Sequence, residues 1–104
     1  MKRATDGYTV VAVENEKIVG TGNITGNEIN AVYVDPRYQQ SGIGKMIVNA
    51  LLNKAKENNH PKVVLDATLN AKKFYDSLGF ITLEKLTQVV KNANLDYYKM
   101  EKGF

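Results

Sequence analysis

The segment Gln39-Gln40-Ser41-Gly42-Ile43-Gly44-Lys45 has the residue types and spacing of a loop that binds an anionic ligand. Its two glycines carry no side chain, so the backbone there can approach a ligand closely. Apolar residues at helical spacing begin directly after the first glycine, and the free N–H groups and positive dipole end of a helix N-terminus favour a phosphate or pyrophosphate. A plain turn into the helix is the alternative interpretation, because a G-x-G pattern alone is weak.

Two well-known nucleotide fingerprints do not fit this loop. A dinucleotide-binding fingerprint needs a third glycine, and the position three after Gly44 is Ile47. A Walker loop needs Ser or Thr after Gly-Lys, and Met46 follows Lys45. Any anion bound here is therefore expected to be held in another way.

The residues before the loop predict three antiparallel strands at 8–13, 18–24 and 28–34, because these segments are rich in β-branched residues and polar turns separate them. Asp35-Pro36 ends the third, since proline cannot continue a ladder. The helix after the loop is expected to end at 58–61. Its sheet-facing residues are predicted to be Ile43, Met46, Ile47, Ala50, Leu51 and Ala55.

The second half of the chain predicts a buried strand at 62–66, which the preceding helix places parallel to the third strand. Apolar spacing at Ala71, Phe74, Tyr75 and Leu78 predicts a second helix, closed by Gly79. Strands are expected at 80–84 and 96–101, with a loop and a short helical piece at 85–95. The expected fold class is α/β with a mixed sheet, in a single domain over 1–104.

Composition narrows the possible partners. The chain has 43% hydrophobic and 24% charged residues and a formal net charge of +3, with the basic residues spread along it, so a nucleic-acid partner is not expected. No apolar run has the length of a membrane span, so no membrane association and a cytoplasmic location are expected. With no Cys and one His, a metal site is not expected either.

The motifs together resemble the GNAT acetyltransferase superfamily. Its cofactor motif, [QR]-x-x-G-x-[GA] after a strand that ends V-x-P, is matched by Val34-Asp35-Pro36 followed by Gln39 to Gly44. Its A-x-x-F-Y-x-x-L-G-F segment is matched by Ala71 to Phe80. The two motifs stand in the right order with a helix and a strand between them, and the resemblance covers residues 8–100.

The resemblance implies that the ligand is acetyl-coenzyme A. Backbone groups of Val32, Tyr33 and Val34 are then expected to pair with the pantetheine arm, as in the addition of a strand. The amides of Gln39 to Lys45 are expected to hold the pyrophosphate. Asn70 is a further candidate contact, although many family members carry their Asn two positions earlier, where this sequence has Thr68.

Two residues are candidate catalytic groups by the same resemblance. Tyr75 occupies the general-acid position, where a phenol with a pKa of about 10 can protonate the leaving thiolate. Its alternative interpretation is a core aromatic residue at helical spacing. The distance in sequence from Glu28 to Gly42 resembles that from the catalytic base to the cofactor loop in the family's histone acetyltransferases. The alternative interpretation of Glu28 is an exposed acid at a turn.

The function expected from the resemblance is direct transfer of the acetyl group from acetyl-coenzyme A to a small-molecule or peptide amine. The alternative is a non-catalytic acetyl-coenzyme A-binding sensor or interaction module. Family members generally begin with a strand and two helices that form part of the acceptor groove, and only about seven residues precede the first strand here. We therefore expect either an open acceptor site or a homodimer in which a second copy completes it.

Overall fold

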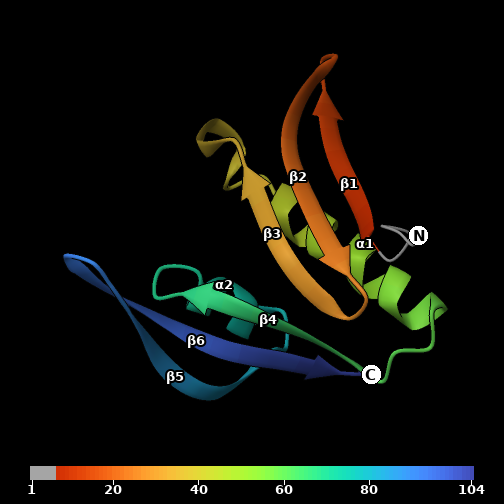
Figure 1. Ribbon diagram of the computed structural model, residues 1–104. Coiled ribbons are helices and arrows are strands. Elements are labelled where there is room, and N and C mark those ends of the chain that lie inside the picture. Colours follow the sequence, from red (N-terminus) through yellow and green to blue (C-terminus); the bar gives the residue numbers. More distant parts are fainter. Residues whose placement is uncertain (1–6) are drawn as a thin grey trace.

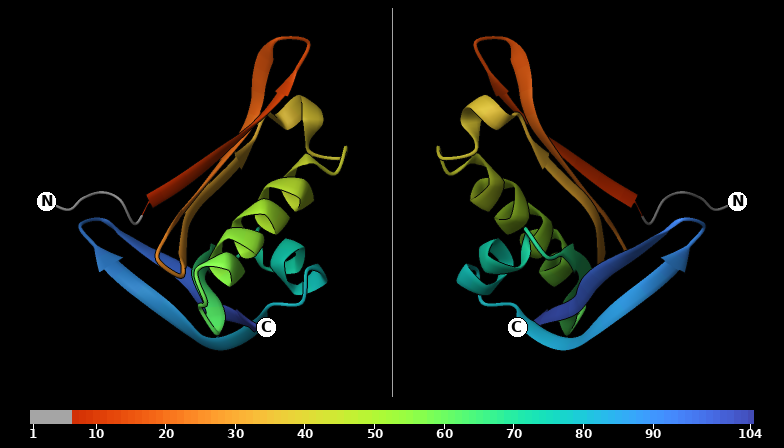
Figure 2. Two further views of the ribbon diagram at one scale, coloured as in Figure 1. Left: turned by 90° about the vertical axis from the view of Figure 1, so that its right-hand side faces the viewer. Right: turned by 90° about the vertical axis from the view of Figure 1, so that its left-hand side faces the viewer.

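The computed structural model describes residues 7–104 and forms one six-stranded mixed sheet with both helices on the same face (Figures 1 and 2). The order of strands across the sheet is β1-β2-β3-β4-β6-β5. The expected α/β class with a mixed sheet is therefore confirmed. The elements in chain order are β1 Gly7–Glu14, β2 Lys17–Thr25, β3 Glu28–Val34, the 3-10 helix η2 Pro36–Tyr38, α1 Ile43–Glu57, β4 Lys62–Thr68, α2 Lys72–Ser77, β5 Ile81–Val90 and β6 Ala93–Gly103.

The first three strands form the antiparallel meander that the sequence predicts. Its central strand carries Gly20 and Gly22, which lie directly under α1. A Cβ atom on Gly20 would stand 2.8 Å from Cδ1 of Ile47, so a larger residue there would push the helix off the sheet. These glycines explain how α1 packs closely on β2.

Helix α1 supplies much of the core. Its six buried residues repeat at helical spacing and face the sheet. The predicted face was wrong at Met46, which is 67% exposed, and right at four other positions. The helix is rotated slightly from the predicted orientation, so Val48 and Leu52 are buried in addition to Ile43, Ile47, Leu51 and Ala55.

Strands β3 and β4 are parallel, as predicted, but they pair only over two positions. Glu28 lies opposite Val64 and Ile29 opposite Leu65, and beyond these pairs the two strands diverge (Figure 1). A register shift in the β2–β3 ladder between Asn23 and Ile24 leaves Asn30 as the extra residue of a bulge, and bulges bend a strand. The sheet therefore splits into two halves that are joined at one end.

The C-terminal half corrects one prediction. Residues 85–95 form no loop with a helical piece; they belong to a long hairpin in which Lys85 lies opposite Tyr98 and Val90 opposite Ala93. The turn is Lys91-Asn92, and Asn92 has a φ of 70°, a left-handed conformation that Asn adopts more readily than most residues. Strand β4 ends where Thr68 faces Tyr97, so the hairpin extends beyond it (Figure 1).

Candidate functional site

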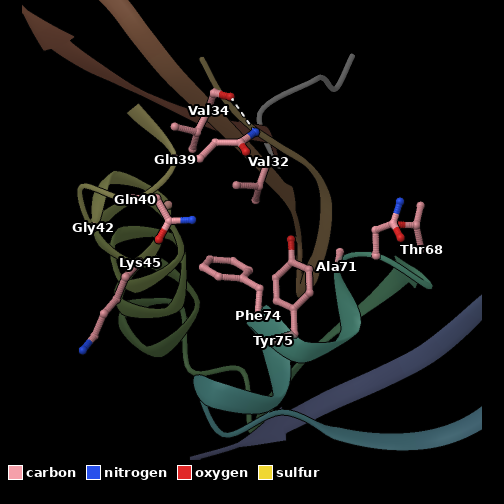
Figure 3. Close-up of a pocket in the computed structure, with 12 residues that line it drawn as sticks. Val32, Val34, Gln39, Gln40, Gly42, Lys45, Thr68, Ala71, Phe74 and Tyr75 are labelled. Carbon is pink, nitrogen blue, oxygen red and sulfur yellow. Dashed lines mark hydrogen bonds between the residues drawn. The ribbon is translucent and has the colours of Figure 1, made fainter. Parts of the chain in front are cut away.

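A cavity of about 530 Å³ lies between β3, the N-terminus of α1 and α2 (Figure 3). This volume is within the range of small-molecule binding sites. Its wall combines apolar side chains with backbone of the glycine loop. The lining residues are Val32, Val34, Gln39, Gln40, Gly42, Gly44, Lys45, Thr68, Asn70, Ala71, Phe74 and Tyr75.

The strand that forms one wall has backbone groups with no strand to pair with. The amide of Asp35 donates to the carbonyl of Val19 at 2.8 Å, so residues one and three positions earlier, Val34 and Val32, direct their N–H and C=O groups away from β2. Strand β4 has already diverged at this point. The side-chain amide of Gln39 donates to the Val34 carbonyl at 3.4 Å (Figure 3).

The glycine loop ends in an uncapped helix N-terminus. Gly42 precedes α1 with a φ of 86°, and no side chain caps the helix. The first helical bond runs from the amide of Met46 to the carbonyl of Gly42 at 3.1 Å, so the amides of residues 43–45 have no acceptor within the helix. With no acidic residue in the first turn, this end of α1 favours an anion.

The turn between β3 and the loop is fixed by a local ion pair. The Asp35 carboxylate accepts from the backbone N–H of Arg37 at 2.9 Å and from its guanidinium Nη2 at 2.9 Å. The hydrogen bond from the Arg37 side chain is the largest cause that holds the pKa of Asp35 below its usual range, and the one from the Arg37 backbone N–H is the next. Asp35 also caps η2, so the chain leaves β3 in a defined direction.

Tyr75 is the buried polar aromatic residue of the site. Its side chain is 8% exposed, and its ring packs edge-on against Phe74 and Phe80 with centroids 5.0 Å and 5.5 Å apart. Its hydroxyl points toward Val32 on β3 (Figure 3). Burial raises the pKa of the Tyr75 hydroxyl above its ordinary value, because the phenolate is desolvated there. The group is therefore a protonated donor at neutral pH.

A second, smaller cavity of about 170 Å³ opens where β3 and β4 separate. It shares Val32, Thr68, Ala71 and Tyr75 with the first cavity. The side chain of Tyr75 thus forms part of both walls. The remaining lining residues are Ile29, Asn30, Ala31, Leu65, Asp66 and Ala67.

The structure brings most of the predicted site residues together. Those that line the larger cavity are Val32, Val34, Gln39, Gln40, Gly42, Gly44, Lys45, Asn70 and Tyr75. Sequence reasoning missed Thr68, Ala71 and Phe74 as lining residues. Their positions could have been found, because Ala71 lies one helical turn before Tyr75 and Thr68 occupies the position of the family's Asn.

Four predicted site residues lie outside both cavities. Tyr33 alternates to the opposite face of β3 and is 59% exposed. Ile43 is buried in the core, and Ser41 donates its amide and its hydroxyl to the Tyr38 carbonyl, so both shape the loop. Glu28 stands at the paired end of β3, opposite Val64. Its role as a base stays a prediction.

Residues 7–104 offer neither a membrane-spanning helix nor a cluster of metal ligands. No helix in this part of the chain is long and apolar enough to cross a membrane. The same residues contain no group of three or more His, Cys, Asp or Glu side chains arranged to hold a metal ion.

Comparison with solved structures supports the topology. A GCN5-related N-acetyltransferase structure from Rhodopseudomonas palustris superposes with a TM-score of 0.89 at 24% identity, over 96% of this chain and 63% of that one. An acetyltransferase structure from Bacillus anthracis, in complex with acetyl coenzyme A, superposes with a TM-score of 0.86 at 25% identity, over 95% of this chain and 63% of that one.

Comparison of sequences adds a curated relative and a family. The chain is 33% identical over 69 residues to a glucosamine 6-phosphate N-acetyltransferase of Trypanosoma brucei brucei, which is 66% of this chain and 46% of that protein. The chain spans about half the length of the curated relatives it matches. The family model described as the acetyltransferase (GNAT) domain matches residues 1–104. The chain belongs to the GNAT acetyltransferase family.

Proposed function

We propose that this chain binds acetyl-coenzyme A and transfers its acetyl group directly to an amine. The observation that carries the proposal is the position of Tyr75, whose buried phenol forms a wall of both cavities. One cavity leads along β3 to the open N-terminus of α1, and the other opens between the diverging strands. An acyl donor and an amine acceptor can therefore meet beside one proton donor.

The residues of the larger cavity fit acetyl-coenzyme A. The backbone groups of Val32 and Val34 offer a donor and acceptor pattern for the amides of the pantetheine arm. The amides of residues 43–45 and the glycine before them suit the pyrophosphate, and the ammonium of Lys45 adds a positive charge. This family match and the fit of the cavity together support acetyl-coenzyme A as the acyl donor.

The proposed chemistry assigns separate tasks to these groups. Acetyl-coenzyme A supplies a thioester carbonyl and a thiolate leaving group. The C–N bond to the acceptor forms as the C–S bond breaks, the nitrogen loses a proton and the sulfur gains one. Tyr75 donates the proton to sulfur, and N–H groups of β3 near Val34 donate to the carbonyl oxygen as it becomes negative. Neither role needs a covalent acetyl-enzyme.

Two measurements test the proposal. Acetyl-coenzyme A at millimolar concentration should raise the melting temperature of the chain, because a ligand held only by the native state stabilises it. A panel of primary amines with detection of released thiol should then identify an acetylated acceptor. No thermal shift would contradict acetyl-coenzyme A binding. A shift without transfer to any amine would favour the alternative, a non-catalytic acetyl-coenzyme A-binding module.

A homodimer and a cytoplasmic location stay predictions. The outer edge of β1 has no partner within residues 7–104, and four exposed apolar side chains lie on the sheet face away from α1, a combination that favours association. They are Val11, Val13, Ile18 and Tyr33. Light scattering at micromolar concentration should report a dimer for the wild type and less of it for Val11→Lys. A monomeric wild type would contradict the prediction.

A further inference from the structure

The sheet face away from the helices carries an excess of carboxylates on its C-terminal half. Val63, Leu65 and Ala67 are buried against the helices, so the alternate residues of β4 project to the other face. The pairings with β3, β6 and β5 extend this face across the sheet. Its charged residues on these strands are Glu28, Lys62, Asp66, Glu84, Lys99 and Glu101.

Four of these six groups are carboxylates, although the whole chain has a net charge of +3. The two ammonium groups are placed beside acids. Lys62 binds Glu101 at 3.0 Å, and Lys99 lies between Asp66 on β4 and Glu84 on β5. This face is therefore negative on a chain that is positive overall, and it presents no isolated cation to an anionic ligand.

Asp66 is the charged residue at the smaller cavity. It lines that cavity with Asn30 and Thr68, and Tyr75 lines the same cavity from α2. Lys99 is its cross-strand neighbour on β6, but within residues 7–104 Asp66 forms no ion pair with a Lys, Arg or His at 4.0 Å or less. The Asp66 carboxylate is therefore not held in an ion pair, and a cationic ligand that enters between β3 and β4 competes for it with Lys99 alone.

We propose that the acceptor is a cationic amine that carries a second positive charge, and that Asp66 is the residue that selects it. This inference rests on the proposed function, since it concerns the acceptor of the same reaction. A diamine or a lysine-like amine places one nitrogen at Tyr75 and a second ammonium near Asp66. A phosphate on the acceptor would be repelled by the same carboxylates. The expected acceptor therefore differs from the sugar phosphate in the names of the curated relatives.

The test is calorimetric titration of the chain saturated with coenzyme A, which cannot donate an acetyl group. Two matched pairs of ligands isolate the charge: 1,4-diaminobutane with 1-aminobutane, and glucosamine with glucosamine 6-phosphate. We expect diaminobutane to bind about three to ten times more tightly than aminobutane, and the phosphate to weaken glucosamine binding, as for a partly screened charge pair. High salt should reduce both differences.

Variants assign the selectivity to Asp66. Asp66→Asn keeps the shape and should bring the affinity for diaminobutane close to that for aminobutane, with aminobutane binding little changed. Asp66→Lys should reverse the glucosamine preference in favour of the 6-phosphate. Glu101→Gln is the matched control, because Glu101 lies on the same face, is paired with Lys62 and lines neither cavity. It should leave both preferences nearly as in the wild type.

Equal binding of the two butyl amines, tighter binding of glucosamine 6-phosphate than of glucosamine, or an Asp66→Asn variant with wild-type selectivity would each overturn the inference. These results do not depend on turnover. If the chain binds coenzyme A but its affinity does not depend on the second charge of the ligand, only this inference is refuted. A chain that does not bind coenzyme A would refute the proposed function, and the amine pairs could then be titrated against the free protein.

Discussion

The ring of Phe74 lies against the backbone of Gly44. A Cβ atom on Gly44 would stand 3.2 Å from Cζ and 3.4 Å from Cε1 of that ring, and 3.6 Å from Cγ2 of Val34. This contact is the point where α1, α2 and β3 meet, at the wall of the larger cavity. The absence of a side chain at Gly44 therefore sets the distance between the two helices.

Gly44→Ala should lower stability by about 1 kcal/mol. Displacing the Phe74 ring costs about 1–3 kcal/mol as overpacking, and the better helix propensity of Ala offsets up to about 1 kcal/mol of this. Urea unfolding measures the difference. Gly103→Ala is the control, because a Cβ atom there meets nothing within 4 Å. A Gly44→Ala variant more stable than the wild type would show that the ring moves without cost.

Gly42→Val should remove the thermal shift produced by acetyl-coenzyme A. Gly42 has a φ of 86°, a conformation that a β-branched residue strongly disfavours, so the loop and its free amides would rearrange. Gly26→Val is a matched control, since Gly26 also has a positive φ of 60° and open surroundings but lies at the β2–β3 turn. Both variants should lose stability, and only the Gly26→Val variant should keep the ligand-induced shift.

Tyr75→Phe should lower turnover by a factor of about 100 to 10,000 if the phenol protonates the leaving thiolate. The ring is retained, so its packing on Phe74 and Phe80 and the KM for acetyl-coenzyme A should change little. Steady-state kinetics with a saturating acceptor measure the effect. Wild-type turnover in the variant would mean that solvent supplies the proton.

The buried phenol also predicts a pH dependence of stability. The pKa of Tyr75 is raised in the native state by desolvation, so the unfolded chain loses this proton first as the pH rises. The stabilisation contributed by the protonated phenol is complete below the unfolded-state pKa of about 10, and it is lost as the pH rises through the native-state pKa. Other groups titrate equally in wild type and Tyr75→Phe. Unfolding at pH 8 to 10.5 should therefore show the wild type losing more stability than the variant, whereas a constant difference would contradict the assignment.

Local patterns predicted most of the elements. The β-branched segments and polar turns of 8–34 predicted three strands in the correct order, and the helical spacing of apolar residues from Ile43 to Ala55 predicted α1. The prediction was weaker for features that tertiary packing determines. The orientation of α1 depends on how Gly20 and Gly22 admit Ile47, and the sequence of the helix alone does not contain that contact. Met46 was misplaced for this reason.

The divergence of β3 and β4 could not be read from the sequence. A strand-helix-strand pattern indicates parallel pairing but not its length. The bulge at Asn30 is accompanied by hydrogen bonds from its side-chain amide to the side chains of Asn23 and Thr25, both at 2.7 Å, and these tertiary contacts are not contained in a local pattern. The long hairpin was missed because residues 85–95 alternate weakly and the turn Lys91-Asn92 lacks the glycine that is typical of two-residue hairpin loops. The site residues were predicted from motifs, whereas Thr68, Ala71 and Phe74 were identified as lining residues from the cavity.

The separation of β3 from β4 also bears on aggregation. Unpaired backbone groups on a strand normally invite a strand of another chain, and β1 and β5 present such groups on the outside of this sheet. The free groups of β3 lie inside the sheet, where β4 of the same chain is the next strand, and Val32 and Val34 line the larger cavity. The fold thus places these hydrogen-bonding groups away from the outer edges, where a strand of another chain would pair with them.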